Sequence, residues 1–175
     1  MEKNQDKAIV KYTGAVCSGL MLTASFPNLG SPLIAWFALV PLMAALRNCS
    51  LLDSLRWGYL FGITHFITLI YWIIPCLKTY GMIPLYLSLI ILLLFAAFLA
   101  LFIAGFAVAV NRVCKDAKML IFIAPVFWVA IEYARAHLFT GFPWELLGYS
   151  QFRILPLIQV ADVLGVYGVS FLVVM

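Results

Sequence analysis

The sequence predicts an all-α integral membrane protein, a polytopic bundle of transmembrane helices with about five complete spans and the start of a sixth. Its 175 residues are 66% hydrophobic and only 10% charged, with a mean hydropathy of +1.10, whereas a typical soluble domain is ~25% charged and ~45–50% apolar. The apolar residues form runs that suit membrane helices, separated by short polar or Gly/Pro-rich stretches. The net charge of +4 comes from basic residues scattered between these runs, so it indicates topology and not nucleic-acid binding.

The first two predicted spans cover residues 8–24 and 33–46. The first follows a charged N-terminus and resembles a signal peptide in outline. Another apolar segment follows at once, so we interpret it as an uncleaved span. The second would rise only about 21 Å, less than the ~30 Å of a hydrocarbon core. We therefore expect it to be short, tilted or partly inserted, with a kink at Pro41.

The third predicted span, residues 57–75, follows a polar loop over residues 47–56 and carries a helical stripe of small and polar residues. Gly58 and Gly62 are four apart, and His65 follows three residues later. Small residues allow another helix backbone to approach closely, so this stripe predicts a packing face. We expect His65 to be a structural polar support that bonds a neighbouring helix; the alternative is a catalytic or proton-relay role.

The fourth predicted span, residues 85–110, is the longest and least polar. Ala96, Ala100 and Ala104 repeat every four residues, which predicts a second close-packing stripe. A short basic loop over residues 111–118 follows.

The fifth predicted span, residues 119–138, carries two charges. Glu132 and Arg135 are three residues apart and share one helix face, with Trp128 one turn earlier. A charge inside a membrane helix costs at least ~2.5–3.5 kcal/mol, so it faces protein or water and usually has a partner. Two interpretations remain open: a buried structural ion pair that joins helices, or the polar wall of a lipid or substrate cavity.

An irregular aromatic segment follows, and the sixth predicted span, residues 157–175, comes after it. The segment contains Thr140-Gly141-Phe142-Pro143-Trp144 and ends near Gln151. Its aromatics suit an interfacial belt, but irregular backbone is tolerated near lipid where protein or a water-filled cavity covers it. We therefore interpret the segment as the rim of a cavity. The aromatic residues are Phe139, Phe142, Trp144, Tyr149 and Phe152.

The distribution of basic residues predicts the orientation. With the N-terminus in the cytoplasm, most Lys and Arg side chains fall on the cytoplasmic side, as membrane proteins prefer. Only Lys78, Arg135 and Arg153 fall on or toward the other side. The loop over residues 140–151 would then lie on the outer face.

Several motifs together resemble a known family. They are Pro125-x-x-Trp128-x-x-x-Glu132-x-x-Arg135, Thr140-Gly141-Phe142-Pro143-Trp144, Gly148-Tyr149-Ser150-Gln151 and Gln159-x-Ala161-Asp162-x-x-Gly165-x-Tyr167-Gly168. In this order they resemble the membrane domain of bacterial apolipoprotein N-acyltransferase. The resemblance covers nearly the whole chain, so we treat residues 1–175 as one N-terminal membrane domain of this type.

The resemblance implies a multi-pass protein of the bacterial inner membrane, with the 140–151 loop in the periplasm. Members transfer an acyl chain from a phospholipid to the N-terminal amine of a diacylglyceryl-cysteine lipoprotein. Their chemistry passes through a thioester on a catalytic Cys, supported by a Glu and a Lys in a nitrilase-like domain. Phospholipid, lipoprotein and membrane lipids are the implied partners, and no cofactor, metal or nucleic acid is expected.

The sequence departs from this family pattern at its end. It stops at Met175 without a nitrilase-like segment, and none of its four cysteines matches the family nucleophile, so we assign no catalytic residue. Three interpretations stay open: an inactive fragment of an acyltransferase, one half of a split enzyme with a separate nitrilase-like chain, or a non-enzymatic membrane scaffold or lipid-binding module. The expected cavity rim is Gly141, Phe142, Pro143, Trp144, Tyr149 and Gln151, with Glu132, Arg135 and His65 as structural polar support.

Overall fold

The computed structural model describes residues 2–27, 30–114 and 116–175, with side chains from residue 8 onward except that of residue 117. These residues form helices and no strand, which confirms the all-α class. The elements in chain order are α1 (Glu2–Ala24), α2 (Pro32–Ala38), α3 (Val40–Leu46), α4 (Leu51–Leu69), α5 (Ile73–Thr79), α6 (Leu85–Val113), α7 (Ala117–His137), the 3-10 helix η1 (Leu147–Gln151), α8 (Leu155–Ile158) and α9 (Ala161–Val174).

The helices at the third predicted span begin and end at residues other than 57 and 75. Helix α4 begins at Leu51 because the Ser50 hydroxyl accepts a hydrogen bond from Asp53 N at 3.1 Å, which caps the first turn. The predicted polar loop over residues 47–56 is therefore partly helical. At the other end α4 stops at Leu69, and α5 continues with a bend of 48°, so residues 57–75 are not one straight span.

The predicted kink in the second span is confirmed. Residues 33–46 form α2 and α3, which are interrupted at Leu39, and Pro41 lies in the first turn of α3. Proline is tolerated there because the first N–H groups of a helix have no partner within it. The sixth predicted span is also broken, into α8 and α9, and α9 is bent at Gly165 (φ 64°, ψ −172°).

Close packing between α4 and α6 forms the centre of the molecule, as the two small-residue stripes predict. A side chain at Gly62 would lie 2.8 Å from the Ala100 Cα atom, and one at Gly58 would lie 3.0 Å from the Ala104 Cα atom. Such distances leave room only for glycine, so the two backbones are in contact. Helix α1 packs against α4, and α7 packs against α6.

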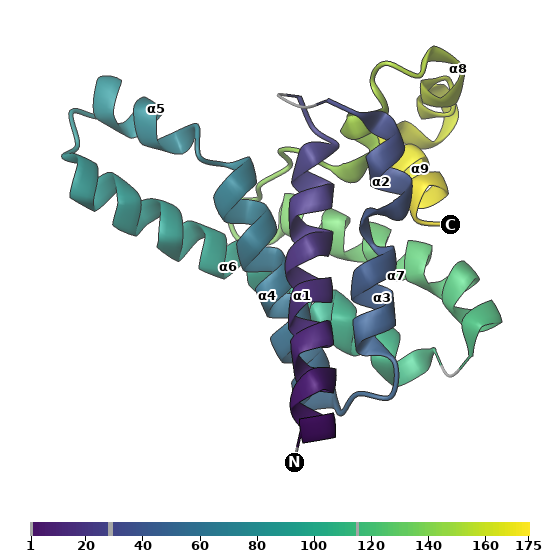
Figure 1. The fold of residues 1–175 in the computed structure, drawn as a ribbon. Coiled ribbons are helices and arrows are strands. Elements are labelled where there is room, and N and C mark those ends of the chain that lie inside the picture. Colours follow the sequence, from purple (N-terminus) through teal and green to yellow (C-terminus); the bar gives the residue numbers. More distant parts are fainter. Residues whose placement is uncertain (1, 28–29, 115) are drawn as a thin grey trace.

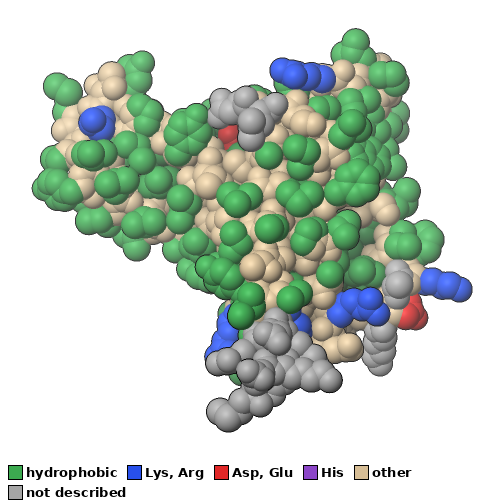
Figure 2. Space-filling model, in the orientation of Figure 1, with side chains coloured by type: hydrophobic (Ala, Val, Ile, Leu, Met, Phe, Trp, Pro, Cys, Tyr) green, Lys and Arg blue, Asp and Glu red, His purple; other side chains and the backbone are tan. Residues whose placement is uncertain are grey.

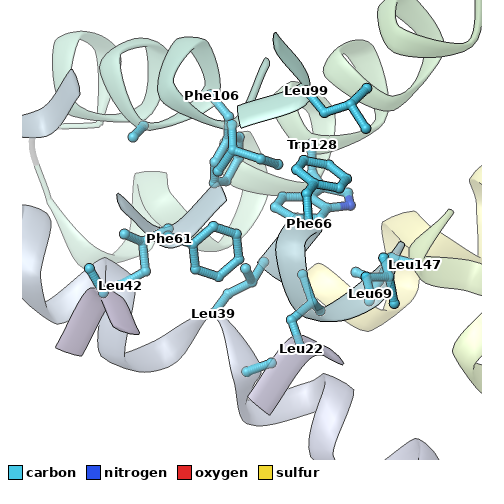
Figure 3. Close-up of a cluster of buried hydrophobic side chains, with 14 of the residues drawn as sticks. Leu22, Leu39, Leu42, Phe61, Phe66, Leu69, Leu99, Phe106, Trp128 and Leu147 are labelled. Atoms are coloured by element: carbon cyan, nitrogen blue, oxygen red, sulfur yellow. The ribbon is translucent and has the colours of Figure 1, made fainter. Parts of the chain in front are cut away.

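Large side chains fill the space between these helices (Figure 3). Phe61 and Phe66 of α4 are buried, and Phe106 of α6 meets Trp128 of α7 edge to face at 5.0 Å between ring centroids. Aromatic pairs of this geometry contribute ~0.5–1.5 kcal/mol beyond the area that they bury. This core holds α7, and with it the charged residues of α7, at a fixed position.

Helix α5 and the first half of α6 form an arm that projects from the bundle (Figure 1). Apolar side chains cover the arm and much of the bundle surface visible in Figure 2. The exposed apolar residues of α6 include Leu89, Leu93 and Leu94. Soluble monomers rarely expose apolar patches of this extent. The surface is compatible with a lipid environment.

By length and composition, two helices of the described residues suit a membrane crossing, residues 85–113 and 118–137. The bent pair α4 and α5 counts as a third if it is one span. The apolar helices over residues 8–24, 32–46 and 161–174 are shorter. The predicted number of five complete spans is therefore not confirmed.

Candidate functional site

The segment that connects α7 to η1 has an unusual backbone. Phe139, Gly141 and Glu145 all have a positive φ, of 57°, 70° and 54°. Residues other than glycine seldom adopt this conformation, and it persists only where surrounding contacts impose it. We call residues 138–146 the outer loop. Its first turn folds back on α7, because Phe142 N donates to Arg135 O at 2.8 Å.

Arg135 fixes the middle of the outer loop. Its Nη1 donates to Trp144 O at 2.9 Å. The guanidinium also lies 5.6 Å from the ring centroid of Phe66 and 6.0 Å from that of Phe142, within the range of a cation–π interaction. Arg135 is buried, so these contacts replace the water that its charge loses.

Glu132 fixes the end of the outer loop. Its Oε1 accepts a hydrogen bond of 2.6 Å from Leu147 N, the first residue of η1. No nitrogen of Arg135 lies within 4.0 Å of a Glu132 oxygen in the described structure. Of the two interpretations left open by the sequence, the direct ion pair is therefore not formed: Arg135 binds the backbone of Trp144, and Glu132 binds that of Leu147. Both groups need such partners because a buried charge without one is costly.

The two charges also face a common cavity, together with a residue that the sequence patterns did not reveal. The cavity has a volume of ≈ 20 Å³ open to the centre of a water molecule, and its polar lining is His65, Glu132, Arg135 and Glu145. A single buried water needs about 10–15 Å³ by this measure, so an acyl chain does not fit. A signal for Glu145 did exist, because it is an acidic residue directly after Trp144 in an apolar, aromatic segment.

His65 lies in the same region and contacts α1. Its Nδ1 is 3.0 Å from the Thr23 hydroxyl, and its ring stacks on Phe61 at 6.1 Å. His65 thus bonds a neighbouring helix, and its role as structural support stays a prediction. The structure thus brings together Glu132, Arg135 and His65, which lie on two different helices.

The aromatic side chains of the outer loop pack against the base of the arm. Phe142 meets Phe95 of α6 edge to face at 4.9 Å, and Trp144 lies 5.5 Å from Trp72, which precedes α5. Even so, Trp144 is 57% exposed. The loop therefore presents a large aromatic surface whose backbone is held by buried charges.

Of the expected rim residues, Tyr149 and Gln151 belong to η1 and not to the outer loop. Tyr149 is exposed, whereas Gln151 is fully buried. Gln151 Nε2 donates to Pro32 O at 3.0 Å, and its Oε1 accepts from Trp36 Nε1 at 3.2 Å. Gln151 thus joins η1 to α2, and the polar cavity is lined by other residues.

We expect Gln151→Ala to lower the free energy of unfolding by ~1–3 kcal/mol, because the variant removes two hydrogen bonds that a fully buried side chain makes to α2, each worth ~0.5–1.5 kcal/mol. The measurement is thermal unfolding of the purified chain in detergent. Gln159→Ala is the matched control, since Gln159 is exposed and bonds Leu155 O nearby in the chain. Equal melting temperatures for the two variants would contradict the structural role of Gln151.

Burial raises the pKa of Glu145 from 4.5 to about 7, although Arg135 and Trp72 partly oppose this shift. The folded protein therefore binds more protons than the unfolded chain between these two values, and stability falls as the pH rises through this window. We expect the melting temperature to drop between about pH 4.5 and pH 7. Glu145→Gln should flatten this dependence. Parallel curves for the two proteins would show that Glu145 does not titrate in this window.

Comparisons with known proteins agree with the resemblance seen in the sequence. The family model for the apolipoprotein N-acyltransferase N-terminal domain matches residues 18–175. A protein of Geobacter metallireducens named apolipoprotein N-acyltransferase is 42% identical over 162 residues, which cover 93% of this chain and 31% of the relative. Relatives of the same name from Coxiella burnetii and Wigglesworthia glossinidia brevipalpis are 35% and 31% identical, over 91% and 95% of this chain and 33% and 34% of the relatives.

The chain thus spans about a third of the length of these curated relatives, and the matched family model describes their N-terminal domain. The match includes every residue of the outer loop and of the polar cavity. This chain belongs to the apolipoprotein N-acyltransferase family and corresponds to the N-terminal part of its members.

Proposed function

We propose that this chain is the membrane-embedded part of an apolipoprotein N-acyltransferase. The reaction transfers an acyl chain from a phospholipid to the N-terminal amine of a diacylglyceryl-cysteine lipoprotein. The names of the relatives support the reaction class. The proposed role of this chain rests on the outer loop. Arg135 and Glu132 hold its backbone, while Trp144 remains exposed. This exposed ring is the surface that would contact lipid.

We propose that the bundle crosses the bacterial inner membrane with its N-terminus in the cytoplasm. In this arrangement the short and broken helices also cross, which gives about five complete spans. Figure 2 supports the orientation, since many Lys and Arg side chains visible there lie at the end of the molecule where the chain begins. The positive-inside rule places that end in the cytoplasm. The outer loop then lies on the periplasmic side.

The acyl transfer itself needs a nucleophile, and we assign none to the described residues. In this proposal the bundle positions lipid, and the covalent step belongs to a nitrilase-like domain of the same type of enzyme. The phospholipid donor, the lipoprotein acceptor and any separate catalytic chain are partners in the proposal.

A chimera tests this function. Residues 1–175 replace the matching N-terminal third of the Geobacter metallireducens relative, and mass spectrometry measures N-acylation of a reporter lipoprotein in cells depleted of their own enzyme. We expect acylation to be restored. A control chimera carries the Coxiella burnetii segment at the same junction. If only the control is active, this chain does not serve as the membrane part of the enzyme, and a scaffold role is favoured.

Within the active chimera, we expect Trp144→Ala to lower acyl transfer at least about tenfold, equivalent to ~1.4 kcal/mol, without reducing the amount of protein. The reason is that the exposed indole supplies contact area for lipid that alanine lacks. Tyr80→Ala is the matched control, because Tyr80 is an exposed aromatic residue near the tip of the arm. Unchanged turnover in Trp144→Ala would remove Trp144 from the proposed lipid contact.

A further inference from the structure

The polar cavity holds more hydrogen-bonding atoms than the described residues satisfy. Glu132 Oε2, Glu145 Oε2 and Trp128 Nε1 are buried and lack a partner of normal hydrogen-bond geometry. All three residues line this one cavity. A buried polar atom without a partner costs ~1–3 kcal/mol, and native proteins nearly always provide one. Because these three residues line the same cavity, we infer that a ligand in the cavity supplies the missing hydrogen-bond partners.

The chemistry and size of the cavity define that ligand. Two carboxyl oxygens require donors, and the indole N–H requires an acceptor. The volume of ≈ 20 Å³ open to the centre of a water molecule is enough for about one water. The buried guanidinium of Arg135 lines the same cavity and disfavours a metal cation there. A single water molecule can donate two hydrogen bonds, one to each carboxyl oxygen, and can accept one from the indole N–H.

The orientation of Trp128 agrees with this assignment. Figure 3 shows the indole nitrogen pointing away from Phe106, toward the side of the view where Leu147 lies. Leu147 is the residue whose N–H binds the other oxygen of Glu132. The N–H of Trp128 is therefore turned from the apolar core toward the polar end of the cavity.

We propose that this cavity is a binding site for one structural water molecule. The water accepts a hydrogen bond from Trp128 Nε1 and donates to Glu132 Oε2 and Glu145 Oε2. It joins α7 to the outer loop at a further point, in addition to the bonds made by Arg135 and Glu132 Oε1. This inference concerns the folded chain and does not depend on the proposed acyl transfer.

In the competing arrangement no water is bound, and the side chains around the cavity bond one another directly. Trp128 and Ser170 both face the Glu132 carboxyl group, and Trp72 faces that of Glu145, so a small shift of these side chains would allow direct bonds. Ser170 Oγ already accepts from Gly148 N at 2.8 Å, which leaves its hydroxyl proton free to donate. A test must therefore separate a bound water from a direct bond and from the exchangeable Ser170 proton.

Nuclear magnetic resonance of the ¹⁵N-labelled full chain in micelles makes this separation. Cross-relaxation from the water signal is measured at the Trp128 indole N–H, in the laboratory and rotating frames, where opposite signs indicate a true contact and equal signs indicate chemical exchange. Trp128→Phe assigns the signal. The amide of Ala100, fully buried in α6, is the dry reference. Ser170→Ala removes the exchangeable hydroxyl, with the Trp36 indole signal as the check that this variant is folded.

We expect a contact with water at Trp128 that persists in Ser170→Ala, and none at Ala100. Absence of the contact in the wild-type chain would overturn the proposal in favour of a direct bond. Loss of the contact in a folded Ser170→Ala variant would overturn it as well. If that variant does not fold, an experimental structure that resolves ordered water decides the matter. Density between Trp128 and Glu132 supports the site, and a direct contact between them refutes it.

Discussion

Replacing Gly62 by leucine is expected to separate α4 from α6 and to prevent stable folding of the bundle. Even a single methyl group at Gly62 would lie 2.8 Å from the Ala100 Cα atom and 3.1 Å from its carbonyl oxygen. These are backbone atoms, which cannot move aside as a flexible side chain does. Overpacking a core typically costs ~1–3 kcal/mol, and we expect a leucine here to reach or exceed the upper value.

Gly105→Leu is the matched control for this variant, because Gly105 lies on α6 and is exposed. A methyl group there meets only the Ile131 Cδ1 atom, at 3.7 Å. The measurement is the fraction of monodisperse protein after detergent extraction, followed by thermal unfolding. Equal behaviour of the two variants would mean that the contact between Gly62 and Ala100 does not hold the helices together.

Removing the Glu132 side chain is expected to have the second large effect. In Glu132→Ala the N–H of Leu147 loses its partner and the buried charge of Arg135 loses its nearest negative neighbour on α7. A buried N–H left without its partner costs ~1–3 kcal/mol, and more where the partner was charged; Arg135 also loses a compensating charge. We expect a loss of stability at or above the upper value, together with faster proteolysis at the outer loop.

Glu132→Gln is the control, because the amide oxygen still accepts from Leu147 N while the charge is removed. Thermal unfolding and limited proteolysis of both variants separate the hydrogen bond from the charge. If Glu132→Gln is as unstable as Glu132→Ala, the charge is the essential property. If both resemble the wild-type chain, Glu132 does not anchor the outer loop.

The sequence predicted the helical class and the packing faces well, since both follow from regular spacing. Gly58 and Gly62 meet the alanines of α6 as their four-residue intervals suggest. The positions of the helix ends were harder to predict from the sequence, because they depend on single capping hydrogen bonds. The Ser50 cap starts α4 six residues earlier than the hydropathy indicates.

The candidate site was predicted only in part. Glu132 and Arg135 were recognisable as charges in an apolar helix, but their partners are backbone groups of a segment that lies nine to fifteen residues further on. Backbone partners leave no trace in the residue types. The residue types mark Glu145 as an acidic residue in an aromatic segment, but its place at the cavity depends on how the outer loop returns to the bundle, which the local pattern does not encode.

The outer loop is bonded to α7 within its length, at Phe142, through Arg135 O, and directly after it, at Leu147, through Glu132 Oε1. The chain between Glu132 and Leu147 thus forms a loop that hydrogen bonds close, and the positions of these bonds set its length. A single inserted or deleted residue would rotate one attachment point away from the other, so this interval cannot change its length gradually. Among the described residues, no hydrogen bond ties the turn at the tip of the arm, residues 80–84, to the bundle core, so this turn can accommodate such changes. Length variation among relatives should therefore concentrate at the arm and avoid the outer loop.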